Sequence, residues 1–283
     1  KTLFSKSVAR TLLAKIYAEK PLRDYTKVIQ YCDEVKADGF DLVDDFSDLF
    51  GMNAAGTDAK MRNTKESILE AQFTPGAGNW CTWMFGRDLV NWNNNFTWAK
   101  WVTPSRDLIS TFKQEGDEVR FKESVVYYDC GWSNYYPSDN YPFMYKCRSA
   151  NSSIIKYRYA DVLLLKAEAL IMQDTPDLEG AADIIDEVRD RAKLGALSSS
   201  TRSNKDALLN ALLKERRLEL AFEGQRWFDL VRLDKVEEVM NAVHAKDSGR
   251  KAQVYTYDKN SYRLPIPQSV IDANDKIHQN PGY

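Results

Sequence analysis

The chain has 283 residues, with 39 Lys or Arg against 41 Asp or Glu, and its formal net charge of −2 argues against binding nucleic acid or an anionic membrane through bulk positive charge. Hydrophobic residues make up 43% and charged residues 28%, which is typical of a soluble globular protein and not of a disordered one. The longest apolar runs, such as Val162–Leu165, are far shorter than the roughly 20 residues that span a bilayer.

Residues 5–39 predict a pair of helices. Apolar residues recur at helical spacing in the first: Val8, Leu12, Leu13 and Ile16. Ser5 or Ser7 can cap its N-terminus. The second helix carries Cys32 on its apolar face, where we expect a buried free thiol, and ends at Gly39, a residue that favours the left-handed conformation after a helix.

Residues 51–153 have a different composition. They hold most of the Gly, Asn and Trp, and helical periodicity is confined to Ser105–Lys113. Residues 66–73 and 119–128 have the character of strands. Long irregular segments within compact proteins often carry function, so this insertion is the place to look for a binding site.

Residues 154–283 return to a helical pattern that repeats the first pair. Tyr159, Leu163 and Lys166 match Val8, Leu12 and Lys15, and Ile185 and Gly195 match Ile29 and Gly39. Each helix pair has about 34 to 40 residues, the size of a tetratricopeptide repeat, and such repeats stack to bury their apolar faces. A third helical stretch is predicted from about Asn204 to Leu233, followed by an extended segment at 262–268 and a short helix from Ser269.

The fold class predicted from these patterns is mostly α, with tetratricopeptide-like helix pairs in an α-α superhelix. A long, irregular, loop-rich insertion with a few short strands interrupts it. We expect one domain over 1–283, in which 1–50 and 154–283 form the helical scaffold and 51–153 the aromatic-rich excursion that binds ligand.

Six of the seven Trp lie between Trp80 and Trp132, and Asn residues from Asn79 to Asn140 are interleaved with them. The apolar face of a sugar ring stacks on an indole or phenol, and its hydroxyls pair with the donor and acceptor of an amide. The predicted ligand-binding residues are Trp80, Trp83, Trp92, Trp98, Trp132 and Tyr135. Alternatively, individual aromatics pack as loop core. Stacking on nucleic-acid bases is disfavoured, because such sites usually add a basic groove and the only basic residues between Trp80 and Trp101 are Arg87 and Lys100.

Catalytic and metal-binding motifs are absent, and we expect no catalytic residues, no metal and no cofactor. The charged segment 214–230 has Arg216, Glu223 and Arg226 on one face, a spacing that favours structural ion pairs over acid–base chemistry. Five carboxylates near the aromatics are candidates for a glycosidase pair: Asp88, Asp107, Glu115, Asp117 and Glu118. Nothing in the sequence singles out two of them. The acidic run from Asp41 to Asp48 lacks the spacing of a calcium loop.

Three cysteines lie in loop-like surroundings: Cys81, Cys130 and Cys147. Two of them can pair if the compartment is oxidising, and their spacing does not say which two.

Three segments together resemble the SusD/RagB family of Bacteroidetes. Tyr159–Ala169 is similar to its RYADVLLMYAEA segment, Glu215–Arg232 to its ERRxELAxEGxRxxDLxR helix, and Pro265–Gln268 with Asn280–Tyr283 to its C-terminal PIPxxE…NPGY ending. The resemblance implies a non-enzymatic, lipid-anchored protein on the extracellular face of the outer membrane. It also implies that the protein captures an oligosaccharide and delivers it to a SusC-like TonB-dependent transporter.

The family's ligand residues are not a fixed motif, so the six predicted aromatics rest on composition alone. Family members are typically longer, and residues 1–20 resemble a helix from the middle of the family's proteins. We therefore expect the chain to be the C-terminal portion of a longer protein or a short member, without the lipid anchor. The alternatives are a helical scaffold that binds a protein or peptide and no sugar, and a carbohydrate-active enzyme.

Overall fold

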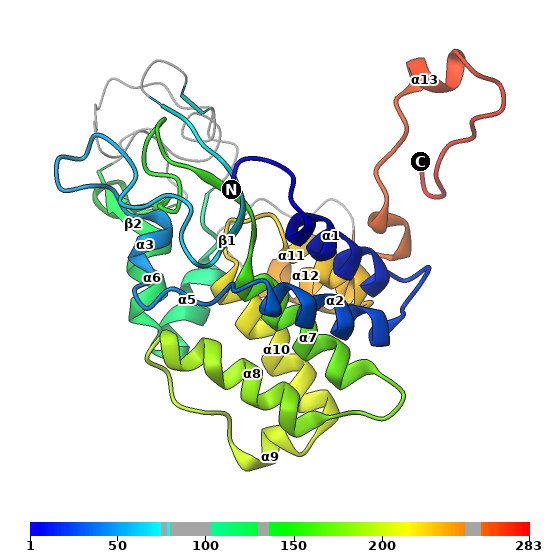
Figure 1. Ribbon diagram of the computed structural model, residues 1–283. Helices are drawn as coiled ribbons and strands as arrows, with labels where there is room; N and C mark the ends of the chain where they lie inside the picture. The colour runs from blue at the N-terminus through cyan, green and yellow to red at the C-terminus, as the bar shows by residue number, and fades with distance from the viewer. Residues whose placement is uncertain (75–77, 80–102, 130–135, 247–255) are drawn as a thin grey trace. The chain divides into compact units, whose positions relative to one another are not determined.

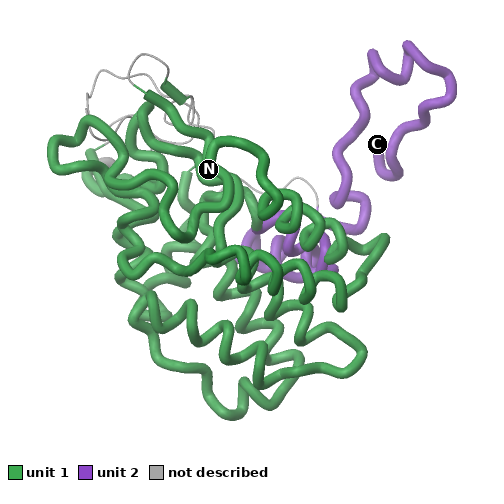
Figure 2. Tube along the Cα trace, viewed as in Figure 1, with its two compact units in different colours: residues 1–225 green, residues 226–283 purple. Residues whose placement is uncertain are grey.

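The computed structural model describes residues 1–74, 78–79, 103–129, 136–246 and 256–283, and most of the secondary structure in these ranges is helical (Figure 1). The chain divides into two compact units, Lys1–Gln225 and Arg226–Tyr283 (Figure 2). The mostly α-helical fold class predicted from the sequence is confirmed.

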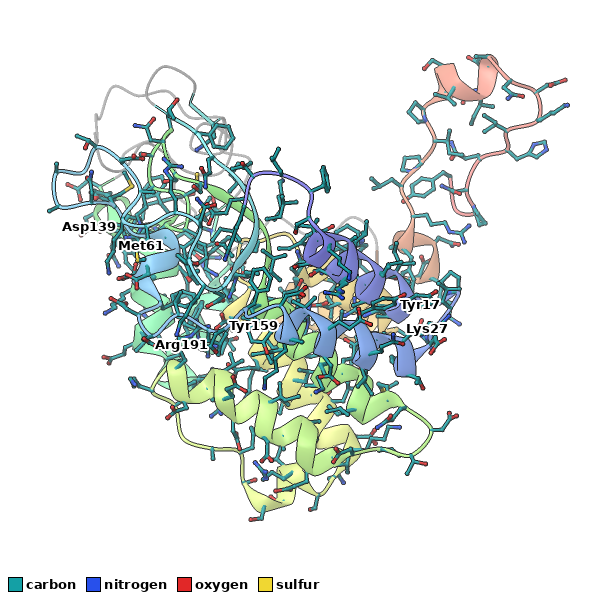
Figure 3. All side chains as sticks on the ribbon, viewed as in Figure 1. Tyr17, Lys27, Met61, Asp139, Tyr159 and Arg191 are labelled. Atoms are coloured by element: carbon teal, nitrogen blue, oxygen red, sulfur yellow. The ribbon has the colours of Figure 1, made fainter. Side chains whose placement is uncertain are left out.

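The first helix pair of unit 1 forms as predicted. Helix α1 (Lys6–Ala18) begins after Ser5, whose hydroxyl accepts a hydrogen bond from the backbone N–H of Val8. Helix α2 (Tyr25–Ala37) is followed by Gly39 at φ +88°. The two helices are linked at their surface by Lys27, whose ammonium lies 4.5 Å from the ring centroid of Tyr17 (Figure 3).

The second pair supplies the centre of the core. Helix α7 (Tyr159–Met172) is buried on nearly all sides, as expected of a helix that is apolar around its whole circumference. It contacts α1, α2, α8 (Leu178–Arg191) and α10 (Lys205–Glu219) (Figure 1). The expected equivalence of Gly195 with Gly39 is wrong, because α8 ends at Arg191 with Ala192 as its C-cap, and Lys193 takes the left-handed conformation at φ +61°.

The long helix predicted over 204–233 is interrupted. Helix α10 stops at Glu219, and the next helix, α11 (Arg226–Arg232), begins in unit 2. Between them Phe222 has φ +65° and Gly224 has φ +78°. Residues in the left-handed region cannot continue a right-handed helix, so the apolar periodicity runs across a turn. A short helix, α9 (Ser199–Arg202), precedes α10.

Short helices and two pairs of strands lie in the described part of the insertion and at its borders. Strand β1 (Ser67–Ala71) falls within the predicted strand 66–73 and pairs antiparallel with β4 (Ile154–Arg158). Strand β2 (Val125–Tyr128) pairs antiparallel with β3 (Tyr141–Met144), so that Tyr128 faces Tyr141. The helices of this region are α3 (Ser47–Phe50), α5 (Arg106–Glu115), α6 (Glu118–Ser124) and the 3-10 turn η1 (Ser138–Asn140).

The predicted strand over 119–128 is therefore only half correct. Asp117 caps α6 by accepting a hydrogen bond from the backbone N–H of Arg120, and the chain is helical as far as Ser124. A side-chain cap satisfies a donor that the helix leaves unpaired, and it stabilises the first turn against the extended alternative.

Unit 2 contains α11, α12 (Val236–Lys246), the 3-10 turn η2 (Lys259–Tyr262) and α13 (Gln268–Asp272). Trp227 is half-buried and packs on Tyr257 with ring centroids 6.3 Å apart. The predicted extended segment is confirmed over 263–267, between η2 and α13, and the short helix begins at Gln268, one residue earlier than expected. The chain end folds back on this segment, where Asn280 donates to the carbonyl of Leu264 at 2.7 Å.

Cys32 is buried and free, as predicted, and burial raises the pKa of its thiol. Cys147 is also buried, whereas Cys81 and Cys130 lie outside the described residues. Among the helices that the structure describes, none is long and apolar enough to cross a membrane.

Replacing Leu164 by Ala tests whether α7 is the centre of the core. The Leu164 side chain is completely buried, so Leu164→Ala should lower the free energy of unfolding by about 2–5 kcal/mol. Leu3→Ala is the matched control because Leu3 is 80% exposed and loses little contact on truncation. Chemical denaturation measures both, and equal effects of the two substitutions would contradict this placement of the core.

Candidate functional site

Unit 1 contains a cleft of about 510 Å³, here called the α5–β2 cleft, between α5, β2 and residues 136–140. This volume is within the roughly 300–1,000 Å³ of typical small-molecule sites. Its lining residues come from three segments: Arg106, Ile109, Ser110, Lys113, Gln114, Tyr127, Tyr136, Pro137 and Asn140.

Helix α5 presents one face to the cleft and the other to the core. Ser105 caps its N-terminus, accepting from the backbone N–H of Leu108, and Gly116 ends it at φ +67°. Leu108 and Phe112 pack against α10. Residues three and four apart share a helix face, so the cleft receives the polar residues at 106, 110, 113 and 114.

Tyr136 is held in place by three contacts. Its hydroxyl donates a hydrogen bond to the carbonyl of Pro104 at 2.7 Å. Its ring meets Tyr141 edge-on, with centroids 5.5 Å apart, and the guanidinium carbon of Arg106 lies 5.2 Å from its ring centroid. A ring fixed in this way loses little conformational entropy when a ligand stacks on it.

Tyr127 provides a second phenol from strand β2, where it pairs with Pro142 of β3. It is half-buried, and its ring lies edge-on to Phe121 with centroids 6.4 Å apart. Burial raises the pKa of Tyr127, so the phenol is neutral at physiological pH and can donate or accept a hydrogen bond.

Two amides complete the polar lining. Asn140 is exposed at the end of η1, and Gln114 is exposed on α5, where its side-chain amide donates to the Ser110 hydroxyl at 2.9 Å. Phenol rings beside amides match the apolar face and the hydroxyl rim of a sugar. The cleft therefore combines aromatic rings with amides, the residue types on which the prediction of sugar binding from the sequence depends.

The six predicted site residues all lie outside the described part of the chain: Trp80, Trp83, Trp92, Trp98, Trp132 and Tyr135. Of the aromatic and amide residues interleaved with them, Tyr136 and Asn140 line the cleft. Asn79 and Tyr141 are buried instead. The Asn79 amide donates to the carbonyls of Ser149, Ala150 and Ser152, so it braces a loop.

Sequence reasoning missed Arg106, Gln114 and Tyr127 as cleft residues. Tyr127 belongs to an apolar strand pattern that is typical of core, and Arg106 follows a helix cap. The one available signal was the polar face of the helix predicted at 105–113. The sequence pattern offers no element that would pack against this face.

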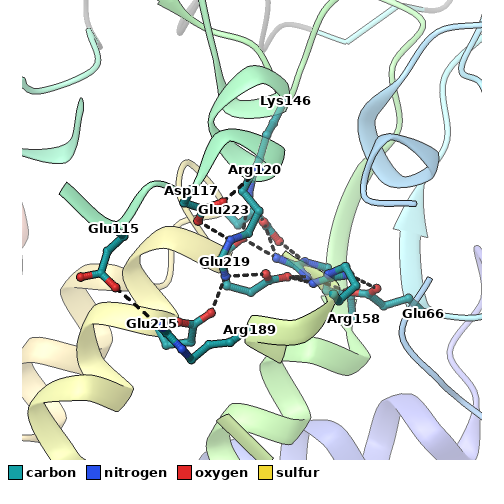
Figure 4. A network of polar contacts seen from close by, with 11 residues as sticks. Glu66, Glu115, Asp117, Arg120, Lys146, Arg158, Arg189, Glu215, Glu219 and Glu223 are labelled. Atoms are coloured by element: carbon teal, nitrogen blue, oxygen red, sulfur yellow. Dashed lines mark hydrogen bonds and ion pairs between the residues drawn. The ribbon is translucent and has the colours of Figure 1, made fainter. Parts of the chain in front are cut away.

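A buried ion network lies beside the helical core (Figure 4). Arg158 binds Glu66 at 2.7 Å, Glu219 at 2.5 Å and Glu223 at 2.6 Å. Arg120 of α6 binds Asp117, Glu215 and Glu219, and Arg191 binds Glu66 and Glu219. Burial alone would raise the pKa of Glu219, but the surrounding Arg charges hold it well below its usual value.

A second buried group joins α1, α7 and α10. Asp161 accepts from Lys15 at 2.6 Å and from Arg216 at 2.8 Å. Burial opposes ionisation of Asp161, but these two cations hold its pKa well below its usual value. Arg216 and Glu223 thus form structural ion pairs, as predicted. The partners of Glu223 are Lys146 and Arg158, which come from other segments of unit 1.

Three of the candidate glycosidase carboxylates form ion pairs: Asp107, Glu115 and Asp117. Asp107 binds Arg217 at 2.6 Å, and Glu115 binds Lys214 at 2.5 Å. Asp117 is buried against Arg120, Glu118 is exposed, and Asp88 lies outside the described residues. None of the described residues that line the cleft is a carboxylate.

The acidic run at 41–48 is neutralised by two lysines. Lys65 binds Asp41 and Asp44, and Lys60 binds Asp45 and Asp48. In the ranges that the structure describes, no three His, Cys, Asp or Glu side chains gather closely enough to hold a metal ion.

Comparison with known proteins identifies the family. A model of the SusD family matches residues 139–283. The chain belongs to the SusD family. Two curated relatives from Formosa agariphila are SusD-like protein P38, 41% identical over 139 residues, and SusD-like protein P2, 34% identical over 142 residues. These matches cover 47% and 48% of this chain but only 25% and 27% of the relatives.

Solved structures share the fold along the whole chain. A SusD superfamily protein from Parabacteroides distasonis has a TM-score of 0.73 at 23% identity and is covered over 64% of its length by all of this chain. Surface glycan-binding protein A from Bacteroides thetaiotaomicron, in complex with laminarihexaose, has a TM-score of 0.72 at 20% identity, with 98% of this chain covering 64% of it. A laminarin-binding SusD-like protein has a TM-score of 0.68 at 24% identity, with coverages of 99% and 63%. The chain therefore spans less than two thirds of these solved structures.

The pair between Asp161 and its two cations predicts an acid-dependent loss of stability. A carboxylate with a lowered folded pKa stabilises the fold above its unfolded pKa of about 3.9, and this contribution is lost as the pH falls toward the folded pKa. Asp161→Asn should therefore cost about 3–5 kcal/mol at pH 7, because it removes the carboxylate that balances the charges of Lys15 and Arg216. The difference from the wild type should shrink below about pH 4.

Urea denaturation between pH 3 and pH 7 measures this difference. Asp44→Asn is the control, because Asp44 is 98% exposed and its pair with Lys65 is open to solvent, so its curve should follow the wild type. A cost of Asp161→Asn that stays constant over the whole pH range would mean that folding does not lower the pKa of Asp161.

Proposed function

We propose that this protein binds an oligosaccharide through the α5–β2 cleft and the aromatic residues of its insertion. The observation that carries the proposal is the pairing of two phenol rings, Tyr127 and Tyr136, with the amides of Asn140 and Gln114 around one cleft. Aromatic rings take the C–H faces of sugars, and amides pair with their hydroxyls.

The comparisons support this proposal. Two of the structurally similar proteins are described as binding laminarin or as a complex with laminarihexaose. Their identity with this chain is 24% and 20%, so what they share with it is the fold. Any sugar binding by this chain therefore has to be argued from its own residues. The phenol rings and amides that line the cleft are suited to bind a sugar.

The six predicted aromatics belong to the same proposal: Trp80, Trp83, Trp92, Trp98, Trp132 and Tyr135. Tyr135 directly precedes Tyr136 of the cleft in the chain, and Trp132 precedes it by only a few residues. Neighbours in sequence to a cleft residue are natural candidates for further stacking contacts.

We extend the proposal to the whole protein as the family resemblance implies. It is a non-enzymatic protein, lipid-anchored on the extracellular face of the outer membrane, and it passes the oligosaccharide to a SusC-like TonB-dependent transporter. The absence of carboxylates from the described cleft lining supports binding without hydrolysis, because hydrolysis of a glycosidic bond generally needs two of them.

Substitutions in the cleft test the proposal. Tyr136→Ala and Asn140→Ala should each weaken oligosaccharide binding by about 3- to 10-fold, since a stacked ring contributes about 0.5–1.5 kcal/mol beyond area burial and a hydrogen bond a similar amount. Isothermal titration against a panel of oligosaccharides measures this. Tyr283→Ala is the control, because Tyr283 is exposed and lies in unit 2.

Equal affinity of both cleft variants and the wild type for a sugar that binds would place the site elsewhere. A blank panel together with co-purification of a transporter would favour the protein-binding scaffold, and product release from any oligosaccharide would favour an enzyme.

A further inference from the structure

The two walls of the α5–β2 cleft are joined at one end. The Tyr136 hydroxyl donates a hydrogen bond to the carbonyl of Pro104, just before the N-cap of α5, at 2.7 Å. The hydroxyls of Thr103 and Tyr141 share a second hydrogen bond of 3.2 Å. Both bonds connect the segment that leads into α5 with the opposite wall, so the cleft is closed where α5 begins.

Exposure to solvent increases along α5 away from this closed end. Pro104 and Ile109 are buried, whereas Lys113 and Gln114 are exposed. A helix rises about 1.5 Å per residue, so residues 106–114 extend over about 12 Å. Lys113 and Gln114 are the last residues of α5 among the described residues that line the cleft. The cleft therefore opens to solvent at the end of α5 that carries them.

The two phenol rings of the cleft lie at different distances from the closed end. Tyr136 contacts Arg106, the first residue of α5. The ring of Tyr127 lies against Phe121, which in turn packs on Phe112 in the second half of the helix. A sugar chain that stacks on both rings therefore runs along α5, from the closed end toward the opening.

We propose that the α5–β2 cleft binds the end of a sugar chain and does not bind sections from its middle. This inference rests on the proposed function, that the cleft binds sugar. The terminal sugar stacks on Tyr136 against the closed end, where no further sugar unit can follow it. The next units pass Tyr127 and leave the cleft beside Lys113 and Gln114. An internal section would need a cleft open at both ends, because the glycan continues on both sides of it.

A polysaccharide cut to different lengths tests the inference. Titration with laminarihexaose, maltohexaose, xylohexaose and mannohexaose first identifies a linkage that binds. Mild acid hydrolysis then cuts the polysaccharide of that linkage to a series of average lengths, each used at the same mass concentration. Each cut creates a new chain, so doubling the number of chains should double the amount of protein bound at saturation, with one protein per chain. Isothermal titration measures this stoichiometry.

Removal of the two hydrogen bonds tests what closes the cleft. The double variant Thr103→Ala/Tyr136→Phe loses both bonds and keeps the ring at 136 for stacking. It should bind more than one protein per chain of the longest fraction, because a glycan can then pass between the walls. Tyr257→Phe is the matched control, because Tyr257 belongs to unit 2 and is not among the described residues that line the cleft. This control should keep one protein per chain, and urea denaturation checks that both variants are folded.

Three outcomes would overturn the inference, and they separate it from the proposed function. If the protein bound at saturation depends on the mass of sugar and not on the number of chains, the cleft recognises internal sections and sugar binding stays intact. If the folded double variant still binds one protein per chain, these contacts do not close the cleft. No binding of any hexamer would end both proposals.

Discussion

The pairing of Arg158 with Glu219 and its neighbours is the constraint on which unit 1 depends. Arg158 is fully buried at the junction of β4 and α7, and its guanidinium binds carboxylates from the insertion, from α10 and from the turn after it. A buried charge is tolerated only when it is paired and its hydrogen-bonding groups are occupied. Glu66 on one side and Glu219 and Glu223 on the other must therefore be brought to one point, and this fixes the insertion against the helical core.

The same chemistry decides what the α5–β2 cleft presents to a ligand. Helix α6 is attached to α10 through Arg120, and α5 through the pairs of Asp107 with Arg217 and Glu115 with Lys214. These pairs orient α5, and they also occupy its carboxylates on the side that faces α10. Arg106 and Lys113 lie on the side that lines the cleft, so the orientation of one helix sets which of its side chains the cleft presents.

Local pattern predicts well where the determinants are local. The pairs α1–α2 and α7–α8 follow from apolar spacing and from the caps at Ser5 and Gly39. It fails where a single backbone conformation or cap overrides the pattern. The break after Glu219 depends on left-handed residues at 222 and 224, and the helical start of the expected strand 119–128 depends on the cap at Asp117. An apolar pattern continues through both places, because the residues are buried whichever element they form.

By itself, the sequence determined the family, the mostly helical fold class and the kind of side chain concentrated in the insertion. Those depend on motifs and periodicities that lie close together along the chain. Only the tertiary structure decided which charges are paired and which face a cleft. Arg120 meets Glu215 and Tyr136 comes beside Arg106 across many intervening residues, and such contacts leave no periodic trace in the sequence. The formal charge of −2 accordingly predicts nothing about which charged side chains line a cleft, because ion pairing within the fold decides where each charge lies.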